Sequence, residues 1–203
     1  MNIVLREITV KDLVQNYTNN EEKGVKMCKE YELMEKIFIK SIADTFRGVK
    51  MNFGRSMILV GGNGGSASQA DHFVGELVGR FNGIETPIPA ISLSSNSAVL
   101  TALANDYSYN FAFSLSLRAF QSFTGISLWL STSGESKNII EGIKEAKKHD
   151  ILTFAITGNS ESTVAKLADY SLNIKGSTQA VQERTLKVLH KIARELKSIK
   201  EGE

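Results

Sequence analysis

Residues 57–66 read Met57-Ile58-Leu59-Val60-Gly61-Gly62-Asn63-Gly64-Gly65-Ser66, an apolar run followed at once by a glycine-rich turn. The apolar run is typical of a buried strand, and the helix-favouring residues after Ser66 indicate that the turn opens a helix. Glycine lets the backbone approach a ligand closely, and the exposed N–H groups of a helix start attract anions. The stretch therefore predicts a strand, a turn and a helix that bind a phosphorylated small molecule.

The same alternation of strands and helices continues along the chain. Further strand-like runs fall at 90–93, 126–130, 151–156 and 170–174, and helical patterns fall at 66–80, 97–121, 136–148 and 161–168. We expect the second helix to break near Asn105, with Asn105-Asp106 capping a helix that begins near Tyr107. The alternation predicts an α/β fold with a parallel sheet covered on both faces, whose ligands bind at the carboxyl ends of the strands.

Both ends of the chain have a helical pattern. Residues 20–50 are charged and helix-favouring, and they contain an apolar seam made of Met27, Tyr31, Met34, Phe38 and Ile42. Such a seam packs either against the same domain or against another copy of the chain, and the pattern leaves both open. A final helix is predicted over 178–198. We expect one domain over 1–203, with a helical arm over 1–54, an α/β core over 55–176 and a C-terminal helix over 177–203.

Composition narrows the possible compartments and partners. The chain has 203 residues of ordinary globular composition and a formal net charge of +2, so a nucleic-acid partner has no electrostatic support. Cys28 is the only cysteine, which excludes an intrachain disulfide and favours a reducing compartment. The first residues lack a signal-peptide core, and no apolar run reaches membrane-spanning length. We expect a cytoplasmic protein that binds neither nucleic acid nor membrane.

Two nucleotide-binding patterns resemble the glycine turn, and both are incomplete here. Gly62-x-Gly64-x-x-Ala67 meets the loose dinucleotide fingerprint, but that fingerprint also needs a carboxylate at the end of the next strand. The next strand ends Ser92-Leu93-Ser94-Ser95, without a carboxylate. A Walker-type phosphate loop needs a lysine before Ser or Thr, and none follows these glycines. The sequence therefore disfavours a nucleotide ligand.

A second polar turn follows the apolar run 126–130 and reads Ser131-Thr132-Ser133-Gly134-Glu135-Ser136. Its hydroxyl and N–H groups can converge on an anion, although the same residue types also make an ordinary helix N-cap. The carboxyl ends of parallel strands meet at one edge of a sheet. Two such turns at the same edge therefore favour a phosphate site.

His72, Glu76 and Arg80 recur every four residues after the glycine turn and so share one face of the predicted helix. A histidine and a carboxylate at this spacing can bind one metal ion, whereas a solvated face with a Glu76–Arg80 ion pair is the simpler interpretation. Of the other histidines, His149 precedes a strand and is expected at the surface. His190 lies on the last helix, where a partly buried histidine is the common case. The spacing alone leaves the metal site and the ion pair open.

Taken together, these motifs resemble the bacterial phosphoheptose isomerases, which are built on the sugar isomerase (SIS) domain. The matching segments are Gly62-Asn63-Gly64-Gly65-Ser66, His72-Phe73, Glu76-Leu77, Gly79-Arg80, Asn105-Asp106, Ser131-Thr132-Ser133-Gly134, Ser136 and Gln182-Glu183. The resemblance runs from about residue 20 to about residue 195. It implies a three-layer sandwich of the flavodoxin-like type, with a central parallel five-stranded sheet and helices at both ends.

The resemblance also implies a reaction and a cofactor. The family converts sedoheptulose 7-phosphate to D-glycero-D-manno-heptose 7-phosphate, as a homotetramer with active sites at subunit interfaces and one Zn²⁺ per subunit. The positions that match its metal ligands are His72, Glu76, Gln182 and His190, of which Glu76 and His190 also match its acid–base pair. The positions that match its substrate contacts are Asn63, Gly64, Gly65, Ser66, His72, Glu76, Asn105, Asp106, Ser131, Thr132, Ser133, Ser136 and Gln182.

The chemistry of these residue types agrees with an aldose–ketose isomerase. Such an enzyme needs a base to take a proton from carbon and an acid to serve oxygen, and a carboxylate and an imidazole supply both. The spacing of the last two metal positions raises a difficulty, because Gln182 and His190 lie about 12 Å apart along a continuous helix. One metal ion can receive both only if Gln182 lies at a frayed helix start, or if neighbouring subunits contribute.

The sequence departs from the family close to these positions. Gln179-Ala180 stands where the family commonly has an acidic–basic pair, and Thr185 replaces a histidine. These changes leave open an isomerase that acts on another ketose phosphate. A further alternative is a non-catalytic SIS protein that binds a partner, of the replication-initiator-associating type, to which residues 97–102 are similar. Those relatives generally lack the His190 equivalent and the metal set, so the complete set here favours an enzyme.

Overall fold

A computed structural model describes residues 23–202 of the chain, apart from the side chains of residues 23–28 and 50–53. The helices are α2 (Lys23–Phe53), α3 (Gly65–Val78), α4 (Ser97–Asp106), the 3₁₀ helix η1 (Tyr109–Phe111), α5 (Ala112–Phe120), α6 (Lys137–Lys148), α7 (Thr163–Leu167) and α8 (Thr178–Glu201). The strands are β1 (Met57–Gly62), β2 (Ala90–Ser92), β3 (Thr124–Ser131), β4 (Leu152–Thr157) and β5 (Tyr170–Asn173). Among these helices, none combines the length and the apolarity needed to cross a bilayer.

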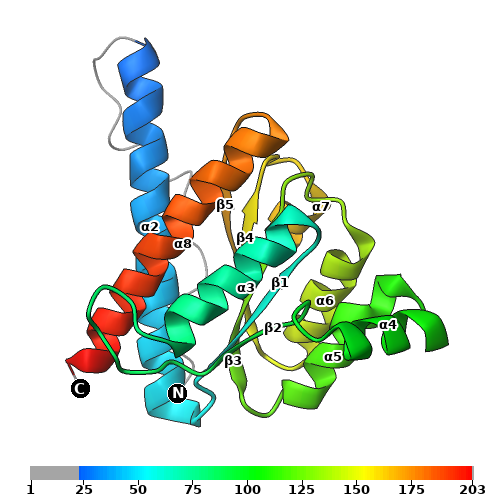
Figure 1. The fold of residues 1–203 in the computed structure, drawn as a ribbon. Coiled ribbons are helices and arrows are strands. Elements are labelled where there is room, and N and C mark those ends of the chain that lie inside the picture. Colours follow the sequence, from blue (N-terminus) through cyan, green and yellow to red (C-terminus); the bar gives the residue numbers. More distant parts are fainter. Residues whose placement is uncertain (1–22, 203) are drawn as a thin grey trace.

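The five strands form one parallel sheet in the order β2-β1-β3-β4-β5. Helices cover both of its faces, with α2, α3 and α8 on one side and α5 and α6 on the other (Figure 1). Each apolar run that predicted a strand forms one. The predicted three-layer α/β fold with a parallel five-stranded sheet and helices at both ends is therefore confirmed.

Alternate residues of each strand fill two separate cores. In β1, Ile58 and Val60 join the core beneath α2, α3 and α8, whereas Leu59 joins the core beneath α5 and α6. Trp129 of β3 is fully buried in that second core. Successive side chains in a strand point to opposite faces, so a sheet covered on both sides needs nearly continuous apolar runs.

The connections after β1 and β3 leave the sheet on opposite faces. The two strands are neighbours, and Gly62 aligns with Leu130 at their carboxyl ends. Helix α3 follows β1 on one face, and α6 follows β3 on the other. Parallel α/β sheets bind ligands at such a switch point. The glycine turn and the Ser131–Ser136 turn therefore meet at one edge of the sheet.

Helices α2 and α8 lie side by side (Figure 1). Phe38 and Ile42 of the predicted apolar seam are buried in the core that α8 shares, and Tyr31 and Met34 are partly buried against it. This part of the seam thus packs within the domain. The side chain of Met27 and the start of the predicted N-terminal arm lie outside the described residues.

The helix break near Asn105 is confirmed, but the predicted cap is wrong. Asn105 and Asp106 are the last residues of α4, and the Asn105 amide donates to the Asp106 carboxylate at 2.9 Å. The next helix, η1, is capped by Ser108, whose hydroxyl accepts a hydrogen bond from the N–H of Asn110 at 3.3 Å. Ser108 has the extended backbone that an N-cap requires, whereas Asp106 is still helical.

A buried lysine ties α8 to the end of α3. The Lys197 side chain has no solvent exposure, and its Nζ donates to the carbonyl oxygens of Gly79 at 2.6 Å and Thr86 at 2.7 Å. Burial disfavours the charged form and lowers the pKa of Lys197, and the carboxylate of Glu76 opposes this shift. The two hydrogen bonds fix α8 against the segment that follows α3.

We expect Lys197→Met to lower the free energy of unfolding by about 2 kcal/mol, because two carbonyl groups lose a charged hydrogen-bond donor. Urea unfolding of the purified protein measures this loss. Lys187 is exposed on the same helix and provides a control, since Lys187→Met should change stability by less than about 0.5 kcal/mol. Equal effects of the two substitutions would contradict the anchoring role of Lys197.

Candidate functional site

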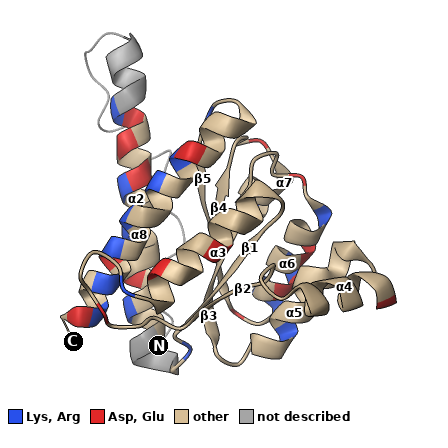
Figure 2. Ribbon diagram, in the orientation of Figure 1, with Lys and Arg blue, Asp and Glu red and all other residues tan. Residues whose placement is uncertain are grey.

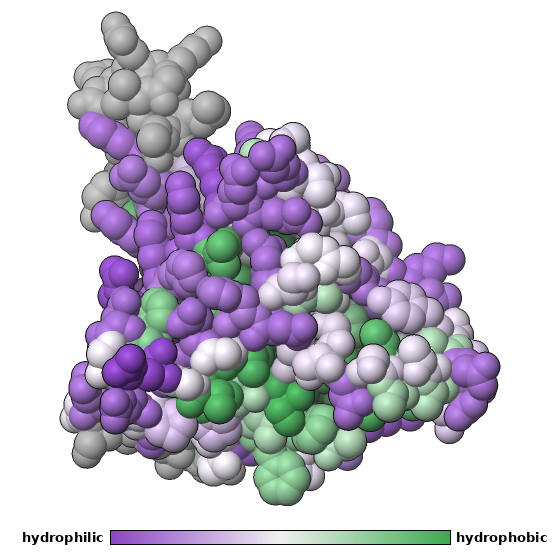
Figure 3. Space-filling view, in the orientation of Figure 1, coloured by the Kyte–Doolittle hydropathy of each residue, from purple (hydrophilic) through white to green (hydrophobic). Residues whose placement is uncertain are grey.

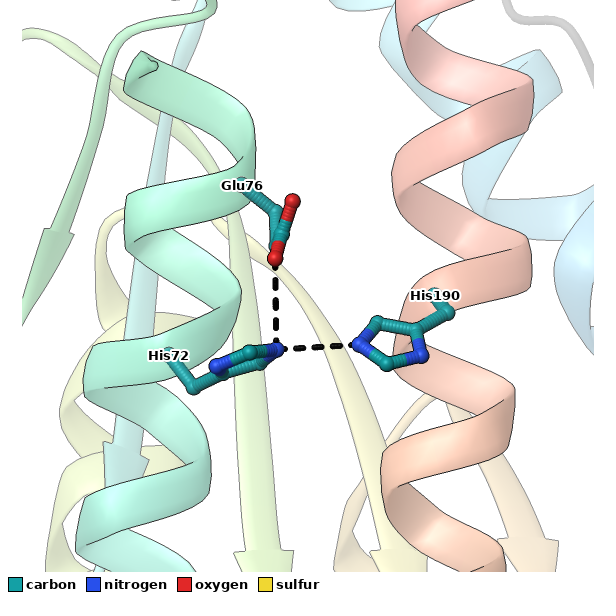
Figure 4. Close-up of side chains that lie close together, drawn as sticks. All are labelled: His72, Glu76 and His190. Carbon is teal, nitrogen blue, oxygen red and sulfur yellow. Dashed lines mark hydrogen bonds and ion pairs between the residues drawn. The ribbon is translucent and has the colours of Figure 1, made fainter. Parts of the chain in front are cut away.

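Three side chains from α3 and α8 converge where these helices lie next to each other (Figure 4). Nε2 of His72 lies 2.9 Å from Nε2 of His190 and 3.3 Å from Oε1 of Glu76. His72 and Glu76 are one helical turn apart on α3, which puts both on the face that meets His190. Residues 118 positions apart in the sequence thus form one cluster.

Apolar packing supports this cluster from below. Each of its members has a fully buried apolar neighbour in the chain, and these neighbours are Phe73, Leu77 and Leu189. All three lie in the core beneath α2, α3 and α8. The cluster itself remains accessible, because 46% of the His72 side chain and 21% of the Glu76 side chain are exposed. The cluster therefore rests on a packed apolar core and is accessible to a ligand.

The cluster has the donor set and the spacing of a metal site. Zinc accepts imidazole nitrogens and carboxylate oxygens, and one ligand atom from each of the three residues lies within 4.8 Å of the others. Ligand atoms about 2.0–2.1 Å from a tetrahedral zinc ion stand about 3.3 Å apart. The His72–Glu76 distance of 3.3 Å matches this value, and the two imidazole nitrogens, 2.9 Å apart, lie somewhat closer together. Three protein ligands are also the usual number in catalytic zinc sites. The residues present fit a zinc ion.

The simpler interpretation, an ion pair between Glu76 and Arg80, does not describe this face of α3. The Glu76 carboxylate faces His72, and Arg80 is exposed just beyond the end of the helix. His149 lies on the other side of the sheet, at the end of α6, where its Nε2 is 3.2 Å from Oε1 of Glu145. Its side chain is 29% exposed, so it is only in part the surface residue that we expected.

The start of α3 is free of side-chain caps. Gly64 precedes the helix with a φ of 54°, a conformation that favours glycine, and it has no side chain to cap the helix. A Cβ at Gly65 would come within 2.5 Å of Nε2 of Gln182, so the Gln182 side chain lies directly against the turn. Ser66 is buried in the first turn of the helix. The N–H groups of Ser66, Ala67 and Ser68 already donate to the carbonyl oxygens of Asn63 and Gly64, so Gly65 supplies the first-turn N–H that can bind an anion.

The start of α6 is uncapped in the same way. Ser136 occupies the N-cap position but makes no side-chain cap hydrogen bond, so an ordinary cap does not account for its hydroxyl. Ser131 is buried, and its Oγ accepts a hydrogen bond from the N–H of Gly134 at 3.0 Å, which shapes the turn. Thr132 and Ser133 are at least partly exposed. Two uncapped helix starts therefore meet at the switch point between β1 and β3.

Two residues that we did not single out from the sequence connect these turns. The side-chain amides of Asn63 and Asn138 exchange two hydrogen bonds, at 2.9 and 2.8 Å. The hydroxyl of Tyr109 donates to Oδ1 of Asn63 at 2.7 Å. In the sequence, Asn138 offered only the weak signal of a polar residue in the first turn of a helix, two positions after Ser136.

Some predicted site residues lie away from the cluster. Gln182 sits within α8, which is already helical from Thr178, and it lies about 12 Å along that helix from His190. A frayed helix start, one of the two conditions for a shared metal ion, is therefore not met. Asn105 and Asp106 are exposed at the end of α4.

His190 also borders a basic cavity of about 350 Å³ between α2 and α8. The cavity is lined by Tyr31, Glu35, Arg184, Lys187, His190, Lys191 and Arg194. Figure 2 shows Lys and Arg residues along α8. Lys191 pairs with Glu35, and the Arg184 guanidinium lies 5.1 Å from the centre of the Tyr31 ring, whose burial raises the pKa of Tyr31 to about 12. Four basic side chains against one carboxylate make the surroundings of His190 attractive to anions.

Comparisons with known proteins agree with this fold. A family model described as SIS domain matches residues 39–158, and a second one with the same description matches residues 126–191. A phosphoheptose isomerase from Dechloromonas aromatica is 37% identical over 183 residues, which cover 88% of this chain and 92% of the relative.

Solved structures give the same result. A phosphoheptose isomerase from Neisseria gonorrhoeae superposes with a TM-score of 0.70 at 30% identity, over 86% of this chain and 92% of that chain. Another from Francisella tularensis shares the fold, with a TM-score of 0.71 at 23% identity over 94% of this chain and 100% of that chain. The chain therefore belongs to the phosphoheptose isomerase family of SIS-domain proteins, and it is an isomerase.

Proposed function

We propose that the protein interconverts sedoheptulose 7-phosphate and D-glycero-D-manno-heptose 7-phosphate. The observation that carries the proposal is that His72 and Glu76, on the helix that begins at the glycine turn, converge with His190 of α8. His72 follows Gly65 by about 10 Å along α3. In this substrate the phosphate is at one end and the reacting carbons are at the other. An anion-binding turn and an acid–base cluster that lie apart on the same helix suit a ligand of this kind.

The phosphate end of the substrate is proposed to bind at the two uncapped helix starts. Backbone N–H groups there attract anions, and hydroxyl groups add hydrogen bonds. The residues proposed to contact the phosphate and the adjoining sugar are Asn63, Gly64, Gly65, Ser66, Ser131, Thr132, Ser133 and Ser136. Gln182 lies against Gly65, which supports a contact with the substrate near this turn.

We also propose that His72, Glu76 and His190 hold one zinc ion per chain. The proposal is supported by the ligand types and by their mutual distances, which fit three protein ligands. When bound, zinc polarises the carbonyl and hydroxyl oxygens of the substrate. The position of Gln182, about 12 Å along α8 from His190, supports a site without it in the same chain.

Glu76 and His190 are the proposed acid–base pair. The Glu76 carboxylate takes a proton from C1 of the ketose while a ring N–H of His190 gives a proton to the oxygen on C2. The carboxylate then returns its proton to C2, and the hydroxyl on C1 returns a proton to the same ring nitrogen, which yields the aldose. One hydrogen moves from C1 to C2, and no external oxidant or reductant is needed.

A homotetramer with active sites at subunit interfaces is proposed as the functional form. Large apolar side chains are exposed from α4 to the start of β3, among them Val99, Phe111 and Phe123. Figure 3 shows apolar side chains gathered at the surface in the lower centre of that view, whereas hydrophilic side chains predominate among the coloured residues above them. Exposed apolar patches often mark protein interfaces. Asn105 and Asp106, which are exposed in the same segment, would then be available to the site of another copy.

The departures on α8 bear on the choice of substrate. Thr185 is buried, and Gln179 donates to the carboxylate of Glu183 at 2.9 Å. Ala180 brings no polar group. None of these three side chains carries the charge that the family commonly has there, so the assay should include other ketose phosphates.

We expect the zinc-loaded protein to convert sedoheptulose 7-phosphate into an aldoheptose 7-phosphate, because it combines an anion site with an acid–base pair. Product analysis by NMR after incubation with the ketose measures this. Parallel incubations with five- and six-carbon ketose phosphates test substrate length. If only a shorter ketose phosphate is turned over, that compound and not sedoheptulose 7-phosphate is the substrate. If no ketose phosphate is turned over, the proposed reaction is wrong.

Glu76→Gln should lower kcat by about a thousandfold, since the amide cannot take the proton from C1. The size of the oligomer should be unchanged by light scattering, because the side chain is partly exposed and keeps its shape. Asp71 is exposed on the same helix, and Asp71→Asn serves as the matched control with unchanged kcat. Full activity of the Glu76 variant would exclude this residue as the base.

A further inference from the structure

We infer that Tyr109 and Asn138 are positioning residues that fix the side-chain amide of Asn63, so that Asn63 meets the substrate only as an N–H donor. The inference rests on the proposed function, because it concerns how that substrate is held. It starts from the hydrogen bonds among three side chains that come from the turn after β1, from η1 and from α6.

One backbone group sets the direction of all these hydrogen bonds. The N–H of Ile139 is shared between the carbonyl oxygen of Ser136, at 3.1 Å, and the side-chain oxygen of Asn138, at 3.0 Å, and because an N–H can only donate, both atoms are acceptors. The Asn138 nitrogen must then be the atom that donates to Oδ1 of Asn63, at 2.8 Å. In return, the Asn63 nitrogen donates to Oδ1 of Asn138 at 2.9 Å. The orientation of both amides follows from a single main-chain donor.

Tyr109 completes the arrangement. Its hydroxyl lies 2.7 Å from Oδ1 of Asn63 and therefore donates to it. That oxygen now accepts two hydrogen bonds, which occupies both of its lone pairs. The Asn63 nitrogen has given one of its two hydrogens to Asn138. What remains of Asn63 for a ligand is one N–H and no acceptor.

The surroundings keep the amide in this state. Asn138 is buried, at 2% exposure, so its hydrogen bonds to Asn63 are shielded from competing water. The Tyr109 ring packs 6.5 Å from the ring of Phe113, which is fully buried. A flipped Asn63 amide would place two oxygens and two N–H groups against each other, so the alternative orientation is disfavoured.

Two consequences for recognition follow. The substrate atom that meets Asn63 must be an oxygen that accepts a hydrogen bond, such as a phosphate oxygen or a sugar oxygen. The Asn63–Asn138 pair also ties the turn after β1 to the first turn of α6, so the two uncapped helix starts keep a fixed separation. Tyr109 and Asn138 thus act on the substrate through Asn63 and through the spacing of the two turns.

A double-mutant cycle between Tyr109→Phe and Asn63→Ala tests the inference. In the native background, Tyr109→Phe should raise KM for the ketose phosphate about fivefold and leave kcat nearly unchanged, because a binding contact is loosened away from the reacting carbons. In the Asn63→Ala background the same change should have less than about a twofold effect, since Tyr109 has no residue to act through. Tyr107, which is exposed two positions earlier, gives the control Tyr107→Phe with unchanged constants.

A loss from Tyr109→Phe that is equal in both backgrounds would overturn the inference. Asn138→Ala enters the same cycle, and if this buried variant does not fold, the Tyr109 cycle decides alone. Binding of a seven-carbon alditol 7-phosphate, which cannot isomerise, is measured by calorimetry on the same variants. If the native protein binds the alditol but turns over no ketose, the proposed reaction fails, and the cycle on the dissociation constant still confirms or overturns the positioning role.

Discussion

The buried ammonium group of Lys197 and the apolar faces of α3 and α8 hold these two helices next to each other over the sheet. The candidate site exists only because of this packing. His72 and His190 are 118 positions apart and come within 2.9 Å, while Gln182 reaches the glycine turn at the other end of the same pair of helices. A small shift of α8 along α3 would therefore break both contacts at once: the His72–His190 contact and the contact of Gln182 with the glycine turn.

A second feature lies at the switch point of the sheet, where two helices begin without a stabilising side-chain cap. A capping side chain typically stabilises a helix by about 1 kcal/mol, and both α3 and α6 start without one. Within these first turns, the N–H groups of Gly65 in α3 and of Lys137 and Asn138 in α6 have no backbone acceptor among the described residues. The Asn63–Asn138 pair holds the two helix starts together. The arrangement makes sense if an anion completes both helix starts.

Much of the fold was predictable, and the reasons are local. A strand buried on both faces leaves a continuous apolar run, so β1 and its neighbours could be recognised, and the four-residue spacing placed His72 and Glu76 on one face. The pairing with His190 has no local signal, because it depends on how α8 lies on α3, and only the family resemblance indicated it. The role of Asn138 could not be predicted for the same reason, since its contact with Asn63 depends on how the two turns pack. The prediction that Asn105-Asp106 caps the next helix was wrong, because Asn and Asp are also common where a helix ends.

The central claim is that His72, Glu76 and His190 act as one metal centre built across α3 and α8. X-ray absorption spectroscopy of the zinc-loaded protein, with zinc quantified per chain, tests it most directly. We predict one zinc ion per chain with nitrogen and oxygen ligands and the scattering of two imidazoles, falling to one imidazole in His190→Ala. A zinc environment that is unchanged by that substitution, or a protein that binds no zinc, would contradict the account.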